Sequence, residues 1–151
     1  MAASPTHRRT STQADVADGL LFLQAFQHGD IDACLEMLHP DIEWHPSPSF
    51  APLEVRRGRE EVRIFLDALY DRFANGLEVQ PDHGRQVGNH MLLITVLRAS
   101  NWFNDQPVRS RECWLVTLRD NLWVRVVSYP NAAAARLAFE ELTAAVTPLA
   151  E

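Results

Sequence analysis

Three side chains of this sequence could take part in proton transfer: His45, Glu112 and Tyr129. His45 ends a short predicted strand, just before a proline-rich loop, and a histidine can give or take a proton near neutral pH. Glu112 lies among apolar residues on a predicted strand, where an unpaired carboxylate is costly, so it could act as a general acid or orient His45. Tyr129 could donate a hydrogen bond to a substrate oxygen. These residue types together predict acid-base chemistry on a small molecule.

Each of these residues also has a purely structural interpretation. His45 could be a hydrogen-bonded or exposed residue at a pocket mouth, and Tyr129 a structural hydrogen-bond donor. Glu112 could pair with Arg125 on the adjacent strand or lie near the exposed end of its own strand. Both interpretations stay open, because a histidine without identified partners is weak evidence for catalysis.

Several further residues are candidates for contact with a bound molecule. Trp44 could wall a pocket and stack on a flat ligand, or simply pack in the core. Arg125 and Tyr129 lie an even number of residues apart on the last predicted strand, and therefore on one face. The candidates for ligand binding are Phe22, Trp44, Phe65, Leu97, Trp114 and Arg125.

The overall composition argues against several classes of partner and cofactor. The formal net charge is -6, and the 14 basic residues form no run, so neither nucleic acid nor an anionic membrane is the expected partner. No apolar run reaches the roughly 18 residues that a membrane span needs. His39, His83 and His90 do not have the spacing of a metal site, and the sequence has neither a glycine-rich phosphate loop nor a GxSxG elbow. We therefore expect no metal and no organic cofactor.

The two cysteines indicate a reduced environment. Cys34 and Cys113 fall in different predicted elements and form no CxxC motif, which is typical of a cytoplasmic protein. No apolar segment follows Arg8-Arg9, so we predict no secretion signal. Cys113 is expected to be a packed thiol, because no base is identifiable beside it.

The helices and strands that position these side chains are predicted from the apolar spacing, and helices come first along the chain. Residues 1–13 are polar and lack periodicity, so they are predicted to form a disordered tail. The apolar spacing predicts a helix over 14–28 that Gly29 ends, and then a short helix that Asp30 caps and Pro40 stops. A strand over 41–45, a proline-rich loop and a second amphipathic helix over 58–73 follow.

The rest of the chain is predicted to be mostly strand. Segments 77–87, 90–102, 108–118 and 122–129 are rich in β-branched and aromatic residues. Turn signals stand at 88–89, 104–105 and 120–121, and a final helix covers 132–146. A single domain over 14–147 is expected, of the α+β class, with one curved, mostly antiparallel sheet wrapped around helices and an internal pocket.

Both faces of the long strands are largely apolar. If 104–105 forms a two-residue hairpin, Leu97 is opposite Glu112 and Thr95 is opposite Trp114. One face would then line the interior of a cone. The other face needs cover, and a second subunit is the expected source, which predicts a homodimer through the outer sheet face. A single bulge would exchange the two faces.

Four sequence motifs stand out along the chain: FQHGD at 26–30, LHPDIEW at 38–44, GREEVR at 58–63 with Phe65, and RDNLWVR at 119–125 with Tyr129. With these motifs the chain resembles SnoaL-like members of the nuclear-transport-factor-2-like superfamily, over about residues 16–142. One departure is Asn121, where the family usually has glycine; asparagine also tolerates positive φ.

The resemblance implies a cone with a deep pocket, often dimeric, and enzymes such as ketosteroid isomerases and polyketide cyclases. His45 falls where ketosteroid isomerases have their aspartate base, and Arg125 and Tyr129 resemble the family's arginine and tyrosine. We therefore expect an isomerase, cyclase or dehydratase acting on a small apolar carbonyl compound. A non-catalytic ligand-binding or dimerisation module is the alternative, since function does not follow from the fold. Epoxide hydrolysis ranks lower, because the strands offer no obvious pair of aspartates.

Overall fold

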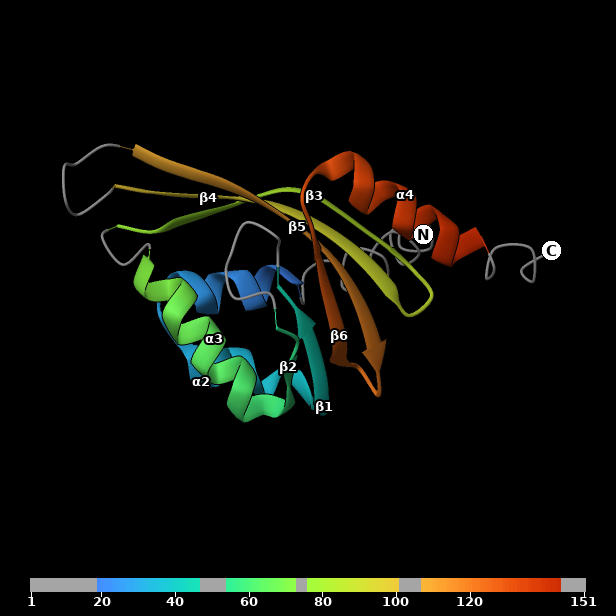
Figure 1. Ribbon diagram of the computed structural model, residues 1–151, viewed down its shortest axis with the longest axis horizontal. Helices are drawn as coiled ribbons and strands as arrows, with labels where there is room; N and C mark the ends of the chain where they lie inside the picture. Colours follow the sequence, from blue (N-terminus) through green and yellow to red (C-terminus); the bar gives the residue numbers. More distant parts are fainter. Residues whose placement is uncertain (1–18, 47–53, 73–75, 101–106, 145–151) are drawn as a thin grey trace, which may run out of the picture.

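A curved six-stranded sheet, in the order β2-β1-β6-β5-β4-β3, forms the centre of the protein (Figure 1). The structure, a computed structural model, describes residues 19–46, 54–72, 76–100 and 107–144. β1 and β6 are parallel, and the other neighbouring strands are antiparallel. The strands are β1 (Leu38–His45), β2 (Arg56–Arg57), β3 (Glu78–Val87), β4 (His90–Ser100), β5 (Pro107–Arg119) and β6 (Leu122–Tyr129). The predicted α+β class is confirmed.

Helices cover both faces of this sheet. Helical residues 19–27, α2 (Ile31–Glu36) and α3 (Gly58–Arg72) lie under the concave face, and α4 (Ala132–Ala144) crosses the other (Figure 1). Gly29 has φ +74°, as a C-terminal glycine cap requires, and Asp30 caps α2 by accepting a hydrogen bond from the Ala33 amide at 3.1 Å. Both predicted caps are therefore confirmed.

Pro40 does not stop the short helix as predicted. The helix α2 ends at Glu36, and Pro40 lies inside β1. The register of β1 against β6 shifts between Leu38 and Glu43, so the missing N–H of Pro40 falls where the ladder is irregular. β1 consequently starts three residues earlier than the predicted strand.

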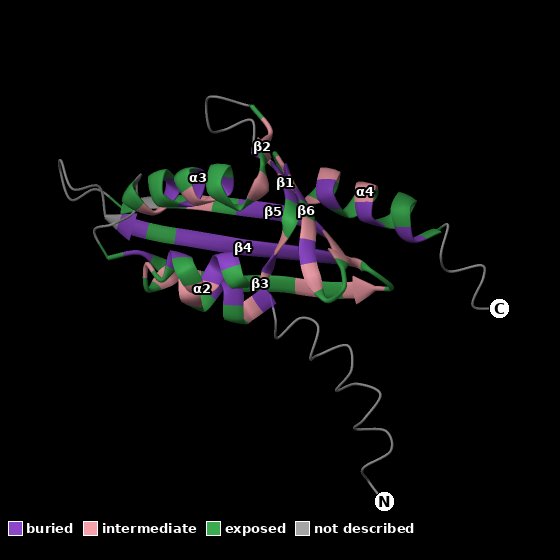
Figure 2. Cartoon of the chain, turned by 90° about the horizontal axis from the view of Figure 1, so that it is seen from below, coloured by how far each residue is buried: buried purple, intermediate pink, exposed green. Residues whose placement is uncertain are grey.

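We call the concave face the inner face, and its buried side chains form the larger core. Strands β4, β5 and β6 contribute residues such as Leu93, Trp114 and Trp123, and the helices below contribute Phe22 and Leu66. Figure 2 shows β4 as buried along most of its length, in keeping with a strand that is covered on both sides.

The opposite side, the outer face, has a smaller core under α4. Ala135 and Phe139 of α4 pack there on Leu92, Ile94 and Leu115. The cover that the sequence assigned to a second subunit therefore comes, over this area, from the chain's own last helix.

The register of β4 against β5 differs from the predicted one by two residues. Thr95, not Leu97, is opposite Glu112, and Leu93 is opposite Trp114. The pairing continues to Ser100 and Pro107, and the residues between them lie outside the described ranges. Because a shift of two preserves the alternation, the predicted division of residues between the faces is still correct.

Several predicted boundaries fall outside the described residues. These are the tail over 1–13, the domain limits at 14 and 147, and the turn at 104–105. Within the described ranges, no helix has the length and apolar character needed to cross a bilayer.

Candidate active site

Five of the six predicted ligand-binding residues meet in one buried cluster on the inner face, which we call the aromatic cluster. The five predicted residues in it are Phe22, Trp44, Phe65, Leu97 and Trp114. The ring centroids of Trp44 and Trp114 are 5.1 Å apart in an edge-to-face arrangement, and those of Trp44 and Phe65 are 5.9 Å apart.

Trp123 belongs to the same cluster, although the sequence analysis did not select it. Its ring stacks on that of Phe22 with the centroids 4.4 Å apart. Its position on a strand next to a turn gave no sign of this, because the stacking depends on how β6 pairs with β1 and β5.

Glu112 lies on the same face, directly beside the aromatic cluster. Its residue is only 4% exposed. Ser110 donates a hydrogen bond from Oγ to Oε2 at 3.0 Å, and Trp114 donates from Nε1 to Oε1 at 3.4 Å. Burial raises the pKa of the Glu112 carboxyl above its usual value, and these two hydrogen bonds act in the opposite direction. The carboxyl group is therefore held in place and biased toward its protonated form.

Thr95 is the cross-strand neighbour of Glu112 and is 1% exposed. Its Oγ1 is buried and has no hydrogen-bond partner within the described part of the chain. Buried polar atoms are usually paired, so this hydroxyl has hydrogen-bonding capacity that no described residue uses.

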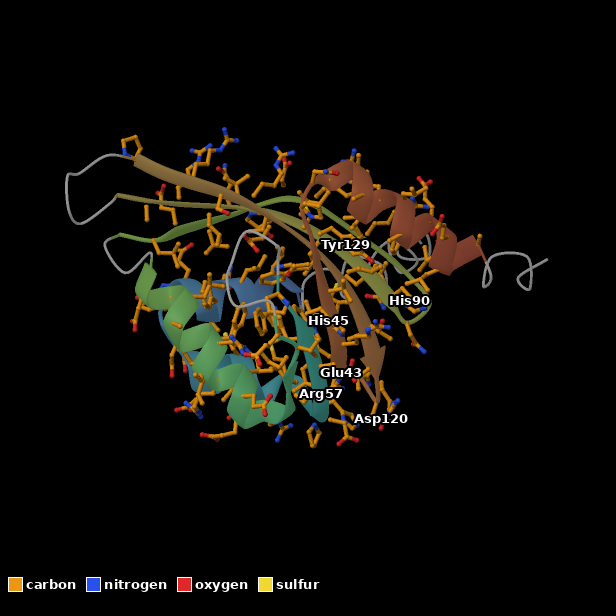
Figure 3. The ribbon with its side chains drawn as sticks, in the orientation of Figure 1. Glu43, His45, Arg57, His90, Asp120 and Tyr129 are labelled. Carbon is orange, nitrogen blue, oxygen red and sulfur yellow. The ribbon has the colours of Figure 1, made fainter. Side chains whose placement is uncertain are left out.

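His45 lies on the other side of the sheet from Glu112. Adjacent strand residues point to opposite faces, and Trp44 points inward, so His45 points outward. Its Nε2 is 3.1 Å from Oε1 of Glu43, whose other oxygen accepts a hydrogen bond from Arg57 (Figure 3). The hydrogen bond from His45, together with Arg57, lowers the pKa of the Glu43 carboxyl.

Tyr129 and Arg125 also lie on the outer face. They line a groove of about 320 Å³ between β6 and α4, and Figure 3 shows Tyr129 beneath that helix. Arg125 is the strand neighbour of Glu43, not a partner of Glu112. The structure therefore does not bring His45, Glu112 and Tyr129 to one cavity.

A separate cavity of about 420 Å³ lies between the turns at 88–89 and 120–121. Glu36, Gln86 and Asp120 are among the residues that line it, and neither Glu112 nor His45 does so. Asp120 and Asn121 both have positive φ in this turn, which confirms the predicted turn and the tolerance of asparagine there.

The described residues contain no group of three or more histidine, cysteine or acidic side chains placed to hold a metal ion. Cys34 and Cys113 are both free and buried. Burial raises the pKa of the Cys34 thiol to about 12 and also raises that of Cys113, so both are protonated near neutral pH.

Comparison with known proteins identifies one family. The model of the family described as SnoaL-like domain matches residues 21–126. No curated protein matches the sequence.

Many solved structures match this one. A protein of unknown function from Burkholderia pseudomallei K96243, described as NTF2-like, is 16% identical with a TM-score of 0.65, over 83% of this chain and 96% of that one. A protein from Jannaschia sp. CCS1, provisionally assigned as a SnoaL-like polyketide cyclase, is 19% identical with a TM-score of 0.66, over 85% and 92%. TerC, co-crystallised with polyporic acid, is 18% identical with a TM-score of 0.64, over 83% and 98%.

Proposed function

The chain belongs to the SnoaL-like domain family, and from that premise we propose that it binds a small apolar carbonyl compound and moves a proton on it. The reaction would be of the isomerase, cyclase or dehydratase kind. It needs no metal or organic cofactor, because the substrate's own carbonyl group serves as the electron sink. The names of two similar structures, a provisional polyketide cyclase and a protein crystallised with polyporic acid, support a small organic ligand.

The observation that carries this proposal is the buried carboxyl group of Glu112. Burial biases it toward the protonated form, and a neutral carboxylic acid can donate a hydrogen bond to a carbonyl oxygen as negative charge develops there. Ser110 and Trp114 hold its two oxygens, so its orientation is fixed before a ligand arrives. Thr95, whose hydroxyl has no partner among the described residues, would supply a second donor.

In this proposal Trp44 and Trp114 present their rings to a flat substrate. His45 and Tyr129 make no contact with it, because both lie on the outer face. Solvent water takes the α-proton and returns one from the solvent, while Glu112 keeps its own proton and donates a hydrogen bond to the carbonyl oxygen.

The test is proton exchange in D2O with a methyl ketone attached to an aromatic ring. 6-Acetyl-2-naphthamide carries exchangeable protons α to its carbonyl group, and one-dimensional NMR follows their replacement by deuterium. Glu112→Gln keeps the shape of the side chain but removes the acid, and it should slow enzyme-dependent exchange by about 10²-fold or more. His45→Ala should slow exchange less than threefold.

The reverse result, a large loss with His45→Ala and none with Glu112→Gln, would return the acid-base role to His45. Circular dichroism of both variants shows whether a loss of exchange reflects a loss of folding.

A second candidate function is a non-catalytic ligand-binding module. It is favoured by the separation of Glu112 from His45 and Tyr129, which leaves the carboxyl without an identified base. In that case ligands would raise the melting temperature, and no proton exchange above the uncatalysed rate would be seen.

We also propose that the protein is a cytoplasmic homodimer. Its two buried, unpaired cysteines suit a reducing compartment. The groove between β6 and α4 contains both Arg125 and Glu141, so a two-fold axis could pair the arginine of one copy with the glutamate of the other. Leu137 and Leu142 of α4 are 58% and 43% exposed, and such a dimer would cover them.

A further inference from the structure

Arg56 is a cation on the inner face that the sequence analysis did not single out. It pairs with Trp44 across the β1–β2 ladder, while its neighbour Arg57 pairs with Glu43. Strand partners point to the same face, so Arg56 lies on the side of the aromatic cluster and Arg57 on the outer face. The two adjacent arginines are therefore separated by the sheet.

The guanidinium of Arg56 has few partners compared with that of Arg57. The carboxylate near it belongs to the exposed Glu54, 3.9 Å from Nη1, whereas Arg57 makes a close ion pair with Glu43. Its Nε is buried and has no hydrogen-bond partner in the described ranges. The side chain remains 22% exposed, so a small molecule can still reach it.

A series of contacts between aromatic rings connects this arginine to Glu112. The guanidinium carbon is 5.8 Å from the centroid of the Phe65 ring, and Phe65 contacts Trp44. Trp44 in turn contacts Trp114, whose indole nitrogen donates to Glu112. The two ionisable groups thus lie at the two ends of one row of buried aromatic rings that contact one another.

We propose that the substrate is an anion: a flat, apolar carbonyl compound that also carries a carboxylate or an acidic enol, which Arg56 binds. A guanidinium can give two parallel N–H bonds to a carboxylate, and a hydrogen bond between charged groups is roughly twice as strong as one between neutral groups. Arg56 would hold the anionic end while the aromatic cluster carries the ring and Glu112 meets the carbonyl oxygen. The inference rests on the proposed function and adds the charge of the substrate to it.

The test compares two probes that differ in charge but hardly in shape, 6-acetyl-2-naphthoate and 6-acetyl-2-naphthamide. Calorimetric titration gives the dissociation constant of each for the wild type and for three variants. The wild type should bind the acid more tightly than the amide. Arg56→Gln should raise the dissociation constant of the acid by at least about 10-fold, since it removes a charge-assisted pair. It should change the dissociation constant of the amide less than threefold. Arg56→Lys should recover part of the loss.

Arg57→Gln is the matched control, because it removes the same charge from the next residue on the opposite face. It should leave both dissociation constants within threefold of the wild type. Equal binding of the two probes, equal losses in the two glutamine variants, or no binding of either probe by the wild type would each overturn the proposal.

The two proposals can fail separately in this design. If Glu112→Gln abolishes proton exchange of the amide probe but Arg56→Gln leaves the preference for the acid unchanged, the anionic substrate is wrong and the catalytic role stands. If Arg56→Gln removes the preference but the wild type exchanges no protons, the binding role of Arg56 stands and the catalytic role is wrong.

Discussion

At the scale of single residues, the alternation of β1 decides which side chains can act together. Trp44 and His45 are adjacent in the sequence, and they point to opposite faces for that reason. The sequence already indicated that His45 faces away from the core, because Ile42 and Trp44 mark the apolar face of this strand. Arg56 carried no such signal, since its neighbour Arg57 has the same side chain and the pairing with β1 distinguishes them.

The first prediction concerns Glu112 and the dependence of stability on pH. The folded protein has a raised pKa at this group, so the unfolded chain loses the proton first as pH rises from about 4.5, the ordinary value. The stability that Glu112 contributes is therefore fully present at low pH and is lost as pH rises through the raised pKa. Compared with Glu112→Gln, the wild type should lose melting temperature as pH rises above about 4.5. Parallel melting curves of the two proteins over that range would contradict the prediction.

Glu43 is the opposite case and gives the second prediction. Its pKa is lowered by His45 and Arg57, so its stabilisation is present above the ordinary pKa and is lost as pH falls through the lowered one. Because the group is partly exposed, Glu43→Gln should cost no more than about 1 kcal/mol at neutral pH. The difference from the wild type should vanish on acidification in urea titrations. A cost that grows toward low pH would contradict this assignment.

At the scale of elements, the type and order of most helices and strands could be predicted from the sequence, but the pairing between strands was predicted less well. The strand expected over 122–129 is β6 as observed, and the helix expected over 58–73 is α3 as far as Arg72, the last residue described there. These predictions rest on local periodicity, which the structure preserves. The β4–β5 register and the short strand β2 depend instead on pairing between strands. Neither has a local signal.

The third prediction concerns the end of helical residues 19–27. Gly29 has φ +74°, and a Cβ added there would lie 3.0 Å from Cζ of Tyr70. Gly58 has φ +84° with nothing within 4 Å of such a Cβ. Both Gly→Ala changes carry the backbone cost of about 1–2 kcal/mol, and Gly29→Ala adds the contact with Tyr70. Urea denaturation should show the larger loss for Gly29→Ala.

The comparison between the two glycines is internal, so it does not depend on the absolute backbone cost. In a protein that already carries Tyr70→Ala, Gly29→Ala should cost no more stability than Gly58→Ala does, because the steric contact with the tyrosine is gone. Equal losses at Gly29 and Gly58 would mean that the tyrosine ring moves aside without cost.

At the scale of the whole molecule, one sheet separates two environments. The inner face holds the aromatic cluster with Glu112 and Arg56, and the outer face holds the core under α4 together with Glu43, His45 and Tyr129. The fold could be predicted because its apolar patterns repeat along whole strands. The site could be predicted only in part, because it depends on which face each single polar residue takes.

The fourth prediction concerns the outer face as a surface for a second copy. If the groove between β6 and α4 forms a two-fold interface, Leu142→Asp should place a charge in an apolar contact and convert the dimer to a monomer. Ile64→Asp is the matched control, since Ile64 is an exposed apolar residue on α3, beneath the concave side of the sheet. Light scattering after size exclusion should give about twice 17.1 kDa for the wild type and Ile64→Asp, and 17.1 kDa for Leu142→Asp. A wild-type mass of 17.1 kDa, or dissociation by Ile64→Asp alone, would remove the outer face from consideration as the interface.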